Sequence, residues 1–312
     1  MTPRVSIITP SYQQSAYLEQ TLNTVLEQEY PDLEYWVMDG GSTDGSLEII
    51  QRYAGRLAGW VSEKDNGQGD GINKGFARAT GEIVAWINSD DYYLPGAIAE
   101  AVRALQANPR AGMVFGDVLA VDGAGQPINL MRYGMWGLEE LMRFEIIGQP
   151  SVFMRRSVLE QAGFLDTSYH LLLDHHLWLR MAQRGEMVYV PRRWSAARYH
   201  PAAKNVAQAP RFAAEVFRLV EWMQSEPGLS EVYRRDERRI QAGAHRLAAF
   251  YLLDGGLPKA ALGEYLKSLA AHPLPALKKD ARRILYAAAS LVIDVERFKK
   301  AYLERRRKNL RL

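Results

Sequence analysis

Three short segments carry side chains that could bind a nucleotide and a metal ion together. Each segment follows an apolar run typical of a buried strand, and the three are Thr9-Pro10-Ser11-Tyr12, Asp39 and Asp90-Asp91. An aromatic ring beside a carboxylate suits a nucleobase, because the ring stacks on the base while the acid accepts an N–H. Two adjacent carboxylates suit a hard divalent cation that bridges phosphate oxygens. Asp90-Asp91 alone could equally be a turn and helix cap, but the three segments together favour a nucleotide–metal site.

The elements that must position these segments alternate between strands and helices. The hydrophobic pattern predicts strands over 5–8, 34–38, 59–62 and 82–88, and helices over 16–28, 46–54, 71–79 and 95–106. This alternation is typical of βαβ units and a mostly parallel sheet, in which ligands bind beyond the carboxyl ends of the strands. We therefore expect the three polar segments to meet at one edge of the sheet.

The rest of the chain is less regular and then becomes helical. We predict strands over 113–118 and 152–154, helices over 138–144 and 177–183, and a helical hairpin formed by 244–251 and 258–271. Strand signals almost vanish from about residue 205. The predicted organisation is an α/β domain over residues 1–205 and a helical C-terminal extension over residues 206–312.

Composition excludes several classes of protein. The 312 residues are 47% hydrophobic and 24% charged, which is typical of a soluble globular protein and too apolar for a disordered one. The chain has no cysteine, which excludes a disulfide scaffold, a thiolate metal site and a cysteine nucleophile. The apolar stretch at 284–293 is ten residues long. A membrane-spanning helix needs about 20 residues, so we do not expect one.

Five segments, taken in order, resemble the inverting family 2 glycosyltransferases of the GT-A fold. They are residues 5–12, 39–46, 79–91, 174–180 and 198–200. The resemblance implies a GT-A-type, mostly parallel sheet flanked by helices, here followed by a helical appendix. It also implies an enzyme that uses Mn²⁺ or Mg²⁺ to move a sugar from a nucleoside-diphosphate sugar. The acceptor would be a hydroxyl of a glycan or a lipid-linked molecule in surface or secreted polysaccharide synthesis.

The resemblance also assigns roles to individual residues. The donor nucleotide would be bound by Thr9, Pro10, Tyr12, Asp39 and Asp90, and Asp90 would contact either the ribose or the cation. Tyr12 would stack on the base and Asp39 would accept its N–H. Asp91 and His200 would hold the metal ion, and Asp174 would be the general base that deprotonates the acceptor hydroxyl. Uridine is the favoured base, thymidine fits the same contacts, and guanosine remains open.

The sequence departs from the family pattern at two positions. Asn88 stands where the family's metal motif often has Asp, and an amide adds no charge, so metal affinity would be lower. Leu173 precedes Asp174 where the family often has Glu, and His175 and His176 remain the alternative bases.

Other assignments also have a structural alternative. Lys74 either contacts the donor diphosphate or is an exposed lysine beside an ordinary connection. Gln149, His175 and Trp136 are candidate contacts for the donor sugar or the acceptor. For Gln149 the alternative is a structural turn. We expect Trp178 to lie in the core, because it sits among apolar residues at helical spacing.

Charge is distributed unevenly along the chain. The net charge is +3, but residues 278–312 hold twelve Lys and Arg against four acids, so the remaining chain is net −5. Basic residues alternating with Phe298, Tyr302 and Leu303 predict contact with an anionic membrane surface, the alternative being a solvated basic helix end. With a lipid-linked acceptor, this would place a cytoplasmic enzyme peripherally on the inner face of the cell membrane. We do not expect a nucleic-acid polymer as partner.

Two other classes of function have less support from the sequence. A nucleotidyltransferase would usually carry a Gly-rich phosphate loop after the first strand, and residues 9–14 lack one. A non-catalytic nucleotide-sugar-binding or scaffolding protein, acting through the helical appendix, is supported only by Asn88 and Leu173. The sequence leaves open the sugar, the acceptor, the linkage and the oligomeric state.

Overall fold

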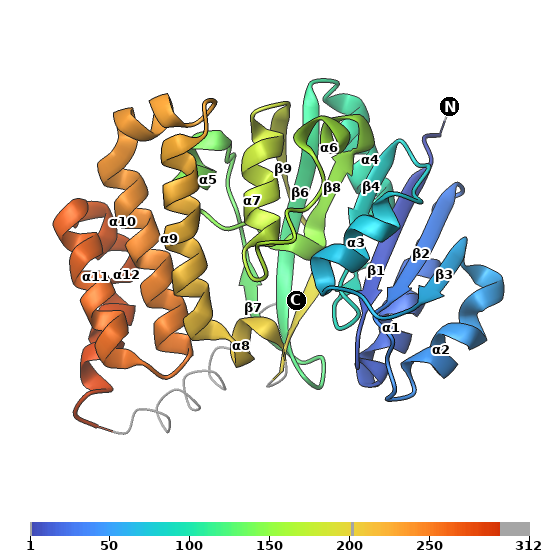
Figure 1. Ribbon diagram of the computed structural model, residues 1–312, viewed down its shortest axis with the longest axis horizontal. Coiled ribbons are helices and arrows are strands. Elements are labelled where there is room, and N and C mark those ends of the chain that lie inside the picture. The colour runs from blue at the N-terminus through green and yellow to red at the C-terminus, as the bar shows by residue number, and fades with distance from the viewer. Residues whose placement is uncertain (1, 201–202, 294–312) are drawn as a thin grey trace. The chain divides into compact units, whose positions relative to one another are not determined.

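The computed structural model describes residues 2–200 and 203–293 and divides the chain into two compact units (Figure 1). The first, which we name the sheet unit, consists of Met1–Gln126, Leu130–Gly137 and Ile147–Arg198. The second, which we name the helical unit, consists of Pro127–Asn129, Leu138–Ile146 and Tyr199–Leu312.

One mixed sheet organises the strands of the described residues. Its order is β3-β2-β1-β4-β8-β6-β9-β5, and β7 pairs with β6 at the side. The strands are β1 (Val5–Ser11), β2 (Leu33–Asp39), β3 (Gly59–Ser62), β4 (Ile83–Trp86), β5 (Tyr92–Tyr93), β6 (Ala111–Asp122), β7 (Pro127–Met131), β8 (Val152–Arg155) and β9 (Glu186–Tyr199). Strands β1 to β4 pair in parallel, whereas β8 runs antiparallel to β4 and β6. The α/β class is confirmed, and the parallel pairing is confined to the half of the sheet built from βαβ units.

Helices cover both faces of the sheet. The helices of the sheet unit are α1 (Ser15–Leu26), α2 (Ser46–Tyr53), α3 (Gln68–Phe76), α4 (Ala97–Ala107), α6 (Arg156–Ala162) and α7 (Leu173–Ala182). Because successive side chains of a strand point to opposite faces, Ala85 packs into the cluster that includes residues of α1 and α4. On the other face Trp86 stacks on Trp178 of α7, with ring centroids 5.2 Å apart, and meets Phe76 of α3 edge to face. The predicted core position of Trp178 is confirmed.

Several element boundaries differ from the predicted ones, and strands β5, β7 and β9 were not predicted. Helix α3 begins at Gln68, three residues before the predicted start, because Gly67 takes a positive φ of 103° and turns the chain directly into the helix. Strand β9 was not predicted, because the exposed Pro191, Arg192 and Arg193 interrupt its apolar pattern. Its far end carries Arg198 toward the acidic residues that follow β4.

The helical unit is a set of packed helices. They are α5 (Leu138–Met142), α8 (Lys204–Ala207), α9 (Ala209–Ser225), α10 (Ser230–Asp254), α11 (Pro258–Ala271) and α12 (Pro273–Ala289). The predicted helical hairpin is formed by α10 and α11, and the chain reverses at Gly256, whose φ is +75°. Helices α10, α11 and α12 share a small apolar core that includes Leu253, Tyr265 and Ala287.

The structure also bears on the expected relation to the membrane. No helix within residues 2–200 and 203–293 combines the length and apolar character needed to cross a membrane. Phe298, Tyr302 and Leu303, on which the prediction of membrane contact rested, lie outside the described residues.

Candidate active site

The carboxyl ends of β1 and β2 lie side by side, with Ser11 opposite Asp39 in the register of the two strands. The Asp39 carboxylate is only 2% exposed. Its Oδ2 accepts hydrogen bonds from the backbone N–H groups of Gly41 and Ser42, at 3.1 and 2.9 Å, and from the Ser62 hydroxyl at 2.7 Å. Asp39 thus organises the loop after β2 and links it to the end of β3.

The end of β1 contributes one exposed aromatic side chain. Tyr12 directly follows the strand and is 61% exposed. Thr9 and Pro10 are buried, and the Thr9 hydroxyl lies 2.8 Å from the hydroxyl of Tyr35 inside the core. Among the three residues in and just after β1 that we assigned to the nucleotide, Tyr12 therefore offers a surface to a ligand, while Thr9 and Pro10 shape the strand beneath it.

The acidic segment after β4 is held by hydrogen bonds on several sides. The buried Asp91 carboxylate accepts the N–H of Arg198 at 2.9 Å and the side-chain amide of Asn88 at 3.3 Å. Thr21 of α1 donates its hydroxyl proton to the Asp91 carbonyl oxygen at 2.6 Å. Burial, followed by the negative charge of Asp90, raises the pKa of Asp91 well above its usual range. The Asp91 carboxylate is thus kept in a place that disfavours its negative charge.

Arg198 is a further residue of this site, and sequence reasoning assigned it no role. Its Nε donates to the Asp90 carbonyl oxygen at 2.9 Å, and another guanidinium nitrogen donates to Gln20 of α1 at 2.6 Å. The guanidinium also lies over the rings of Tyr17 and Tyr92, 4.6 and 5.6 Å from their centroids. Only the tertiary fold brings the end of β9 to α1 and the acidic segment.

Asn88 lies between two glutamine side chains. Gln68 at the start of α3 donates to the Asn88 Oδ1 atom at 2.6 Å, and the Asn88 amide donates to Gln149 at 3.4 Å. Gln149 is buried and donates its own amide to the Trp86 carbonyl oxygen at 2.8 Å. The structure therefore brings Gln149 to the acidic segment, as a neighbour of Asn88, and adds Gln68, which the sequence analysis had not singled out.

A further carboxylate, that of Asp65, lies near the end of β2 and the start of α3. Asp65 is half-buried and accepts the N–H of Gly67 at 2.8 Å. A Cβ atom placed on Gly40 or Gly71 would lie 2.9 or 3.1 Å from its Oδ2 atom, so both glycines allow its close approach. The glycines at 40 and 71 were the available sequence signal, but they pointed to turns rather than to Asp65.

The three candidate bases differ in accessibility. Asp174 is half-buried in the first turn of α7, where the positive end of the helix dipole stabilises its negative charge. Its Oδ1 atom accepts the N–H of His175 at 2.7 Å. His175 and His176 are both buried. Asp174 is thus the candidate whose side chain a substrate could reach most directly.

Three other predicted site residues differ in their burial and in the contacts that they already make. The Lys74 ammonium contacts Glu63 at 3.0 Å and Asp70 at 3.4 Å, so its charge is already balanced within the sheet unit. Trp136 is half-buried and meets Tyr133 edge to face. His200 is buried, follows β9 and belongs to the helical unit, so it is not among the residues that the sheet unit brings together.

The side chains after β4 fit a hard divalent cation. Asp90 and Asp91 supply carboxylate oxygens, which Mg²⁺ and Mn²⁺ favour, and a cation would offset the cost of burying the Asp91 charge. In the part of the chain that the structure describes, no three His, Asp or Glu side chains gather into a complete metal centre. The protein would therefore supply part of the coordination, and oxygens of a bound ligand or water would supply the rest.

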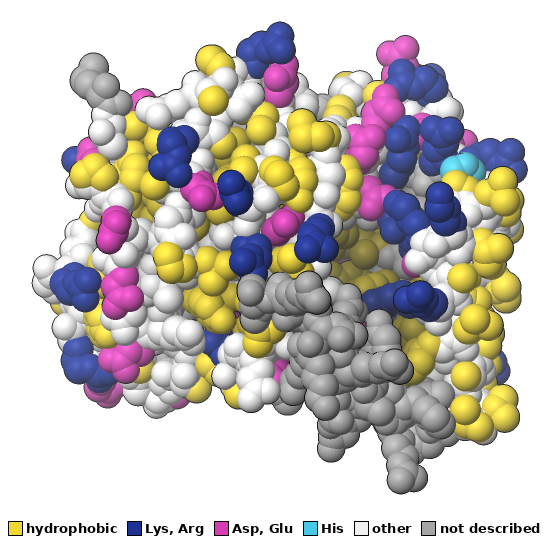
Figure 2. Space-filling view, turned by 180° about the vertical axis from the view of Figure 1, so that it is seen from behind, with side chains coloured by type: hydrophobic (Ala, Val, Ile, Leu, Met, Phe, Trp, Pro, Cys, Tyr) yellow, Lys and Arg dark blue, Asp and Glu magenta, His cyan; other side chains and the backbone are white. Residues whose placement is uncertain are grey.

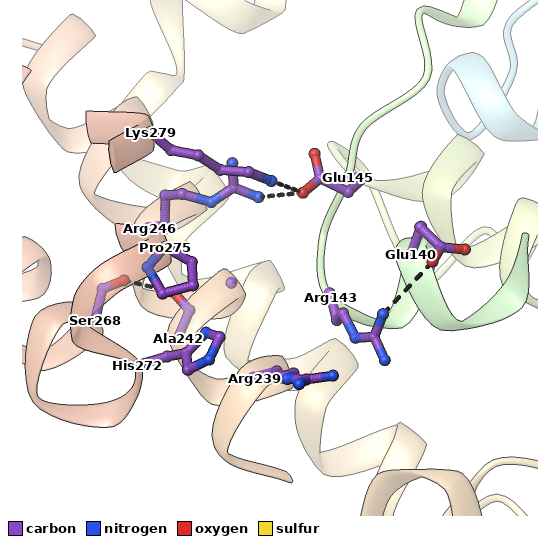
Figure 3. Close-up of a pocket in the computed structure, with 11 residues that line it drawn as sticks. Glu140, Arg143, Glu145, Arg239, Ala242, Arg246, Ser268, His272, Pro275 and Lys279 are labelled. Carbon is purple, nitrogen blue, oxygen red and sulfur yellow. Dashed lines mark hydrogen bonds and ion pairs between the residues drawn. The ribbon is translucent and has the colours of Figure 1, made fainter. Parts of the chain in front are cut away.

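The helical unit has a cavity of its own, with a volume of about 260 Å³ (Figure 3). Basic side chains line it, but carboxylates hold them in place. Glu145 contacts both Arg246, at 3.3 Å, and Lys279, while Arg143 contacts Glu140 at 3.5 Å and also Asp236. These ion pairs join residues 138–146 to α10 and α12, so we interpret the cavity as part of the packing of this unit.

Comparison with known proteins defines the class to which this fold and site belong. Residues 6–160 match the family described as Glycosyl transferase family 2. The chain belongs to this family, and the enzyme class is that of the glycosyltransferases. The predicted resemblance is confirmed.

Two relatives illustrate the sequence similarity. The chain is 34% identical over 129 residues to an uncharacterized glycosyltransferase of Nostoc sp., a match that covers 40% of each chain. It is 29% identical over 194 residues to the putative teichuronic acid biosynthesis glycosyltransferase TuaG of Bacillus subtilis, covering 60% of this chain and 75% of that protein.

Solved structures share the fold at low sequence identity. TarS of S. aureus in complex with UDP superposes with a TM-score of 0.62 at 18% identity, covering 92% of this chain and 87% of TarS. The mannosyltransferase PcManGT of Pyrobaculum calidifontis, in complex with GDP-Man and Mn²⁺, has a TM-score of 0.62 at 22% identity, covering 98% of this chain and 86% of that chain. The GT-A-type sheet flanked by helices, with C-terminal helices after it, is confirmed.

Proposed function

We propose that this glycosyltransferase moves a sugar, with inversion, from a nucleoside-diphosphate sugar to a hydroxyl of a glycan or lipid-linked acceptor. The observation that carries the proposal is the arrangement after β1, β2 and β4. An exposed tyrosine, Tyr12, follows β1, and Asp90 and Asp91, two aspartates held by hydrogen bonds from Arg198, follow β4. Ligands bind at this edge of an open α/β sheet.

Among donors, a uridine nucleotide is favoured. A planar base can stack on the exposed Tyr12 ring, and the loop after β2 offers polar groups beside it. The Asp39 carboxylate already accepts several hydrogen bonds, so the base N–H would share Asp39 with Ser42 and Ser62. TarS binds UDP and UDP-GlcNAc in its structures, whereas PcManGT binds GDP-Man, so both nucleosides belong in the test.

Asp174 is proposed as the general base of the transfer. It takes the proton of the acceptor hydroxyl while the oxygen attacks the anomeric carbon from the side opposite the diphosphate. The new carbon–oxygen bond forms as the bond to the diphosphate oxygen breaks, and the nucleoside diphosphate leaves with the electron pair. The helix dipole at the start of α7 favours the ionised form of Asp174 that this role requires.

Asp90 and Asp91 are proposed as the residues that hold Mn²⁺ or Mg²⁺. Such a cation, when bound, neutralises the charge that develops on the leaving diphosphate. Arg198 keeps the backbone and carboxylate of this segment in place through its bonds to Asp90 and Asp91. His200 stays a candidate ligand from the helical unit. Lys74 would reach a phosphate only by exchanging its contacts with Glu63 and Asp70.

The acceptor belongs to surface or secreted polysaccharide synthesis in this proposal, and the similarity to TuaG supports that choice. Gln149, His175 and Trp136 remain candidate contacts for the donor sugar or acceptor, although the burial of His175 would require a rearrangement before it could touch either. A lipid-linked acceptor would hold the enzyme at the cytoplasmic face of the cell membrane.

The test is a thermal-unfolding panel with UDP, GDP, dTDP and CDP, each with Mn²⁺, Mg²⁺ or EDTA. A ligand that binds the native state at 100 times its Kd adds about 2.7 kcal/mol of stability. We expect one nucleotide to raise the midpoint only with metal, and Asp91→Asn to lose that response.

Glu186→Gln is the matched control, because Glu186 is an exposed carboxylate paired with Arg110. It should keep the full response to nucleotide and metal. If none of the four nucleotides shifts the midpoint with either metal, the donor-site assignment is wrong.

A further inference from the structure

Large apolar side chains are exposed unevenly over the described residues. Of the twelve that are exposed, eight lie between Leu257 and Ile293, on and around α11 and α12. Figure 2 shows hydrophobic side chains following one another along the edge formed by the C-terminal helices, with Lys and Arg side chains gathered at one end. Exposed apolar surface of this extent usually marks a binding surface.

The exposed side chains of α12 share one face of the helix. Leu274, Leu277 and Leu285 are 80%, 53% and 70% exposed, and Ala281 and Ala288 fall on the same stripe at 3.6 residues per turn. Beyond the helix, Leu291, Val292 and Ile293 are exposed as well. Ala287 and the partly buried Ile284 pack into the apolar core that α12 shares with α10 and α11. At 3.6 residues per turn, Ala287 lies well away from the stripe, whereas Ile284 borders it beside Leu277. The exposed leucines therefore lie outside this core but next to it.

Basic side chains flank this stripe. Residues 257–293 contain six Lys and Arg against two acids. Lys278 and Arg282 are exposed and lie on one side of the leucines along the helix. Asp280 is buried, and the largely buried Glu264 contacts His245 and Lys267, so neither acid of this segment lies among the exposed leucines of α12. Lys279 and Arg283 are paired with Glu145 and Asp254, which leaves Lys278 and Arg282 as the exposed cations beside the stripe.

Apolar side chains beside exposed cations favour an anionic lipid surface as the occupant. Leucines can enter the boundary between headgroups and acyl chains while Lys and Arg stay at the headgroups. A second copy of this chain would bring the same cations together across a symmetric interface, and like charges oppose that contact.

We propose that the face of α12 that carries Leu274, Leu277 and Leu285 binds the surface of an anionic bilayer. This inference rests on the membrane location in the proposed function and deepens it. The sequence predicted membrane contact through residues 278–312, and the proposal assigns the contact to α12, including Leu274 and Leu277, which precede that segment. It does not require the donor site, so the two can be tested separately.

The experiment measures co-sedimentation of the full chain with lipid vesicles, without nucleotide. We expect binding to phosphatidylcholine vesicles that contain phosphatidylglycerol, and little binding to pure phosphatidylcholine. The triple variant L274S/L277S/L285S should bind at least about tenfold more weakly, because three apolar contacts are lost. Lys278→Gln combined with Arg282→Gln should also weaken binding about tenfold, and high salt should do the same.

Two control variants test whether this surface, and not another part of the protein, is responsible for vesicle binding. Met135→Ser removes an equally exposed apolar side chain from the sheet unit and should leave vesicle binding unchanged. Asp91→Asn should also bind vesicles like the wild type, so a failure of the donor site is distinguishable from a failure of this surface. Circular dichroism of the triple variant should match the wild type, since the replaced side chains lie outside the core.

Three outcomes would overturn the proposal. Wild-type protein that ignores anionic vesicles would do so directly. A triple leucine variant that binds as well as the wild type would assign the contact to another segment. A wild-type dimer that the triple variant converts to a monomer, as measured by analytical ultracentrifugation, would assign the stripe to a second copy of the chain.

Discussion

The two units of this protein use their surfaces in opposite ways. In the sheet unit, polar side chains gather after β1, β2 and β4, and buried hydrogen bonds such as those of Asp39 and Arg198 hold them. Three of its large apolar side chains are exposed. In the helical unit the carboxylates mainly join helices, while leucines of α12 face outward.

This difference indicates what each unit contributes. A chemical site needs groups fixed to within a fraction of an ångström, and strands of a shared sheet provide that rigidity. A surface for a lipid or partner needs area and charge but little precision, and a helix presents both along one face. The predictions below test this division, beginning with the largest expected effect.

Asp174→Asn should separate catalysis from binding in the sheet unit. The amide cannot accept the acceptor proton, so kcat should fall by about 10²- to 10⁴-fold. Nucleotide binding should stay unchanged, because Asp174 lies on α7 and not in the loops after β1, β2 and β4. Steady-state kinetics and nucleotide titration measure the two properties. A variant that keeps wild-type kcat would return the role of base to His175 or His176.

Gly243→Ala should damage the helical unit specifically. A Cβ at this position of α10 would clash with the backbone oxygen of Arg143, so α10 and residues 138–146 would have to move apart. We expect a loss of about 2–3 kcal/mol in the free energy of unfolding, measured by denaturant titration.

Gly263→Ala is the matched control for this prediction. Gly263 lies in α11, and a Cβ there would meet no atom within 4 Å. Because alanine favours a helix interior, stability should rise by about 0.5–1 kcal/mol. Equal destabilisation by both substitutions would contradict the close packing of α10 on residues 138–146.

Asn88→Asp should sharpen the role of the acidic segment. The new carboxylate would lie near the Asp91 carboxylate and the Gln149 oxygen, at the 3.3 and 3.4 Å now spanned by the Asn88 amide. The added charge should tighten Mn²⁺ binding about tenfold, while the metal-free protein should be slightly less stable. Calorimetric titration with Mn²⁺ and thermal unfolding in EDTA measure the two effects. Weaker Mn²⁺ binding would argue against a cation at this segment.

Asp280→Asn should change the thermal stability least among these variants, and the pH dependence of that change tests the packing of the helical unit. Burial, with a contribution from Glu145, raises the pKa of Asp280 although Arg246, Arg283 and Lys279 oppose the shift. The folded state disfavours the ionised form of Asp280. Its contribution to the free energy of unfolding is therefore fully present below the pKa of the unfolded state, and it is lost as the pH rises through the pKa of the folded state.

The Asp280→Asn variant does not titrate at this position. Its Tm should therefore exceed that of the wild type by about 2 °C at neutral pH, and the difference should vanish in acid. Calorimetry across the pH range would show this trend. A variant that is less stable than the wild type at neutral pH would mean that the three cations outweigh burial.

Several features of this protein could be predicted from the sequence, because local pattern and residue type control them. The strands at 5–8, 34–38 and 59–62, the helical hairpin of α10 and α11, and the family itself were predictable because each depends on neighbouring residues or contiguous motifs. The positions of Asp39, Asp90 and Asp91 after strands followed from the same βαβ pattern.

Long-range packing sets which side chains meet and which face outward. Arg198 reaches Asp91 across 107 positions of sequence, and Gln68 reaches Asn88 across 20, through contacts that no local pattern encodes. Burial of Thr9 and His175, and exposure of Leu274, likewise depend on what packs against each face. Long-range packing sets these positions, because a residue's own type limits its chemistry but not its neighbours.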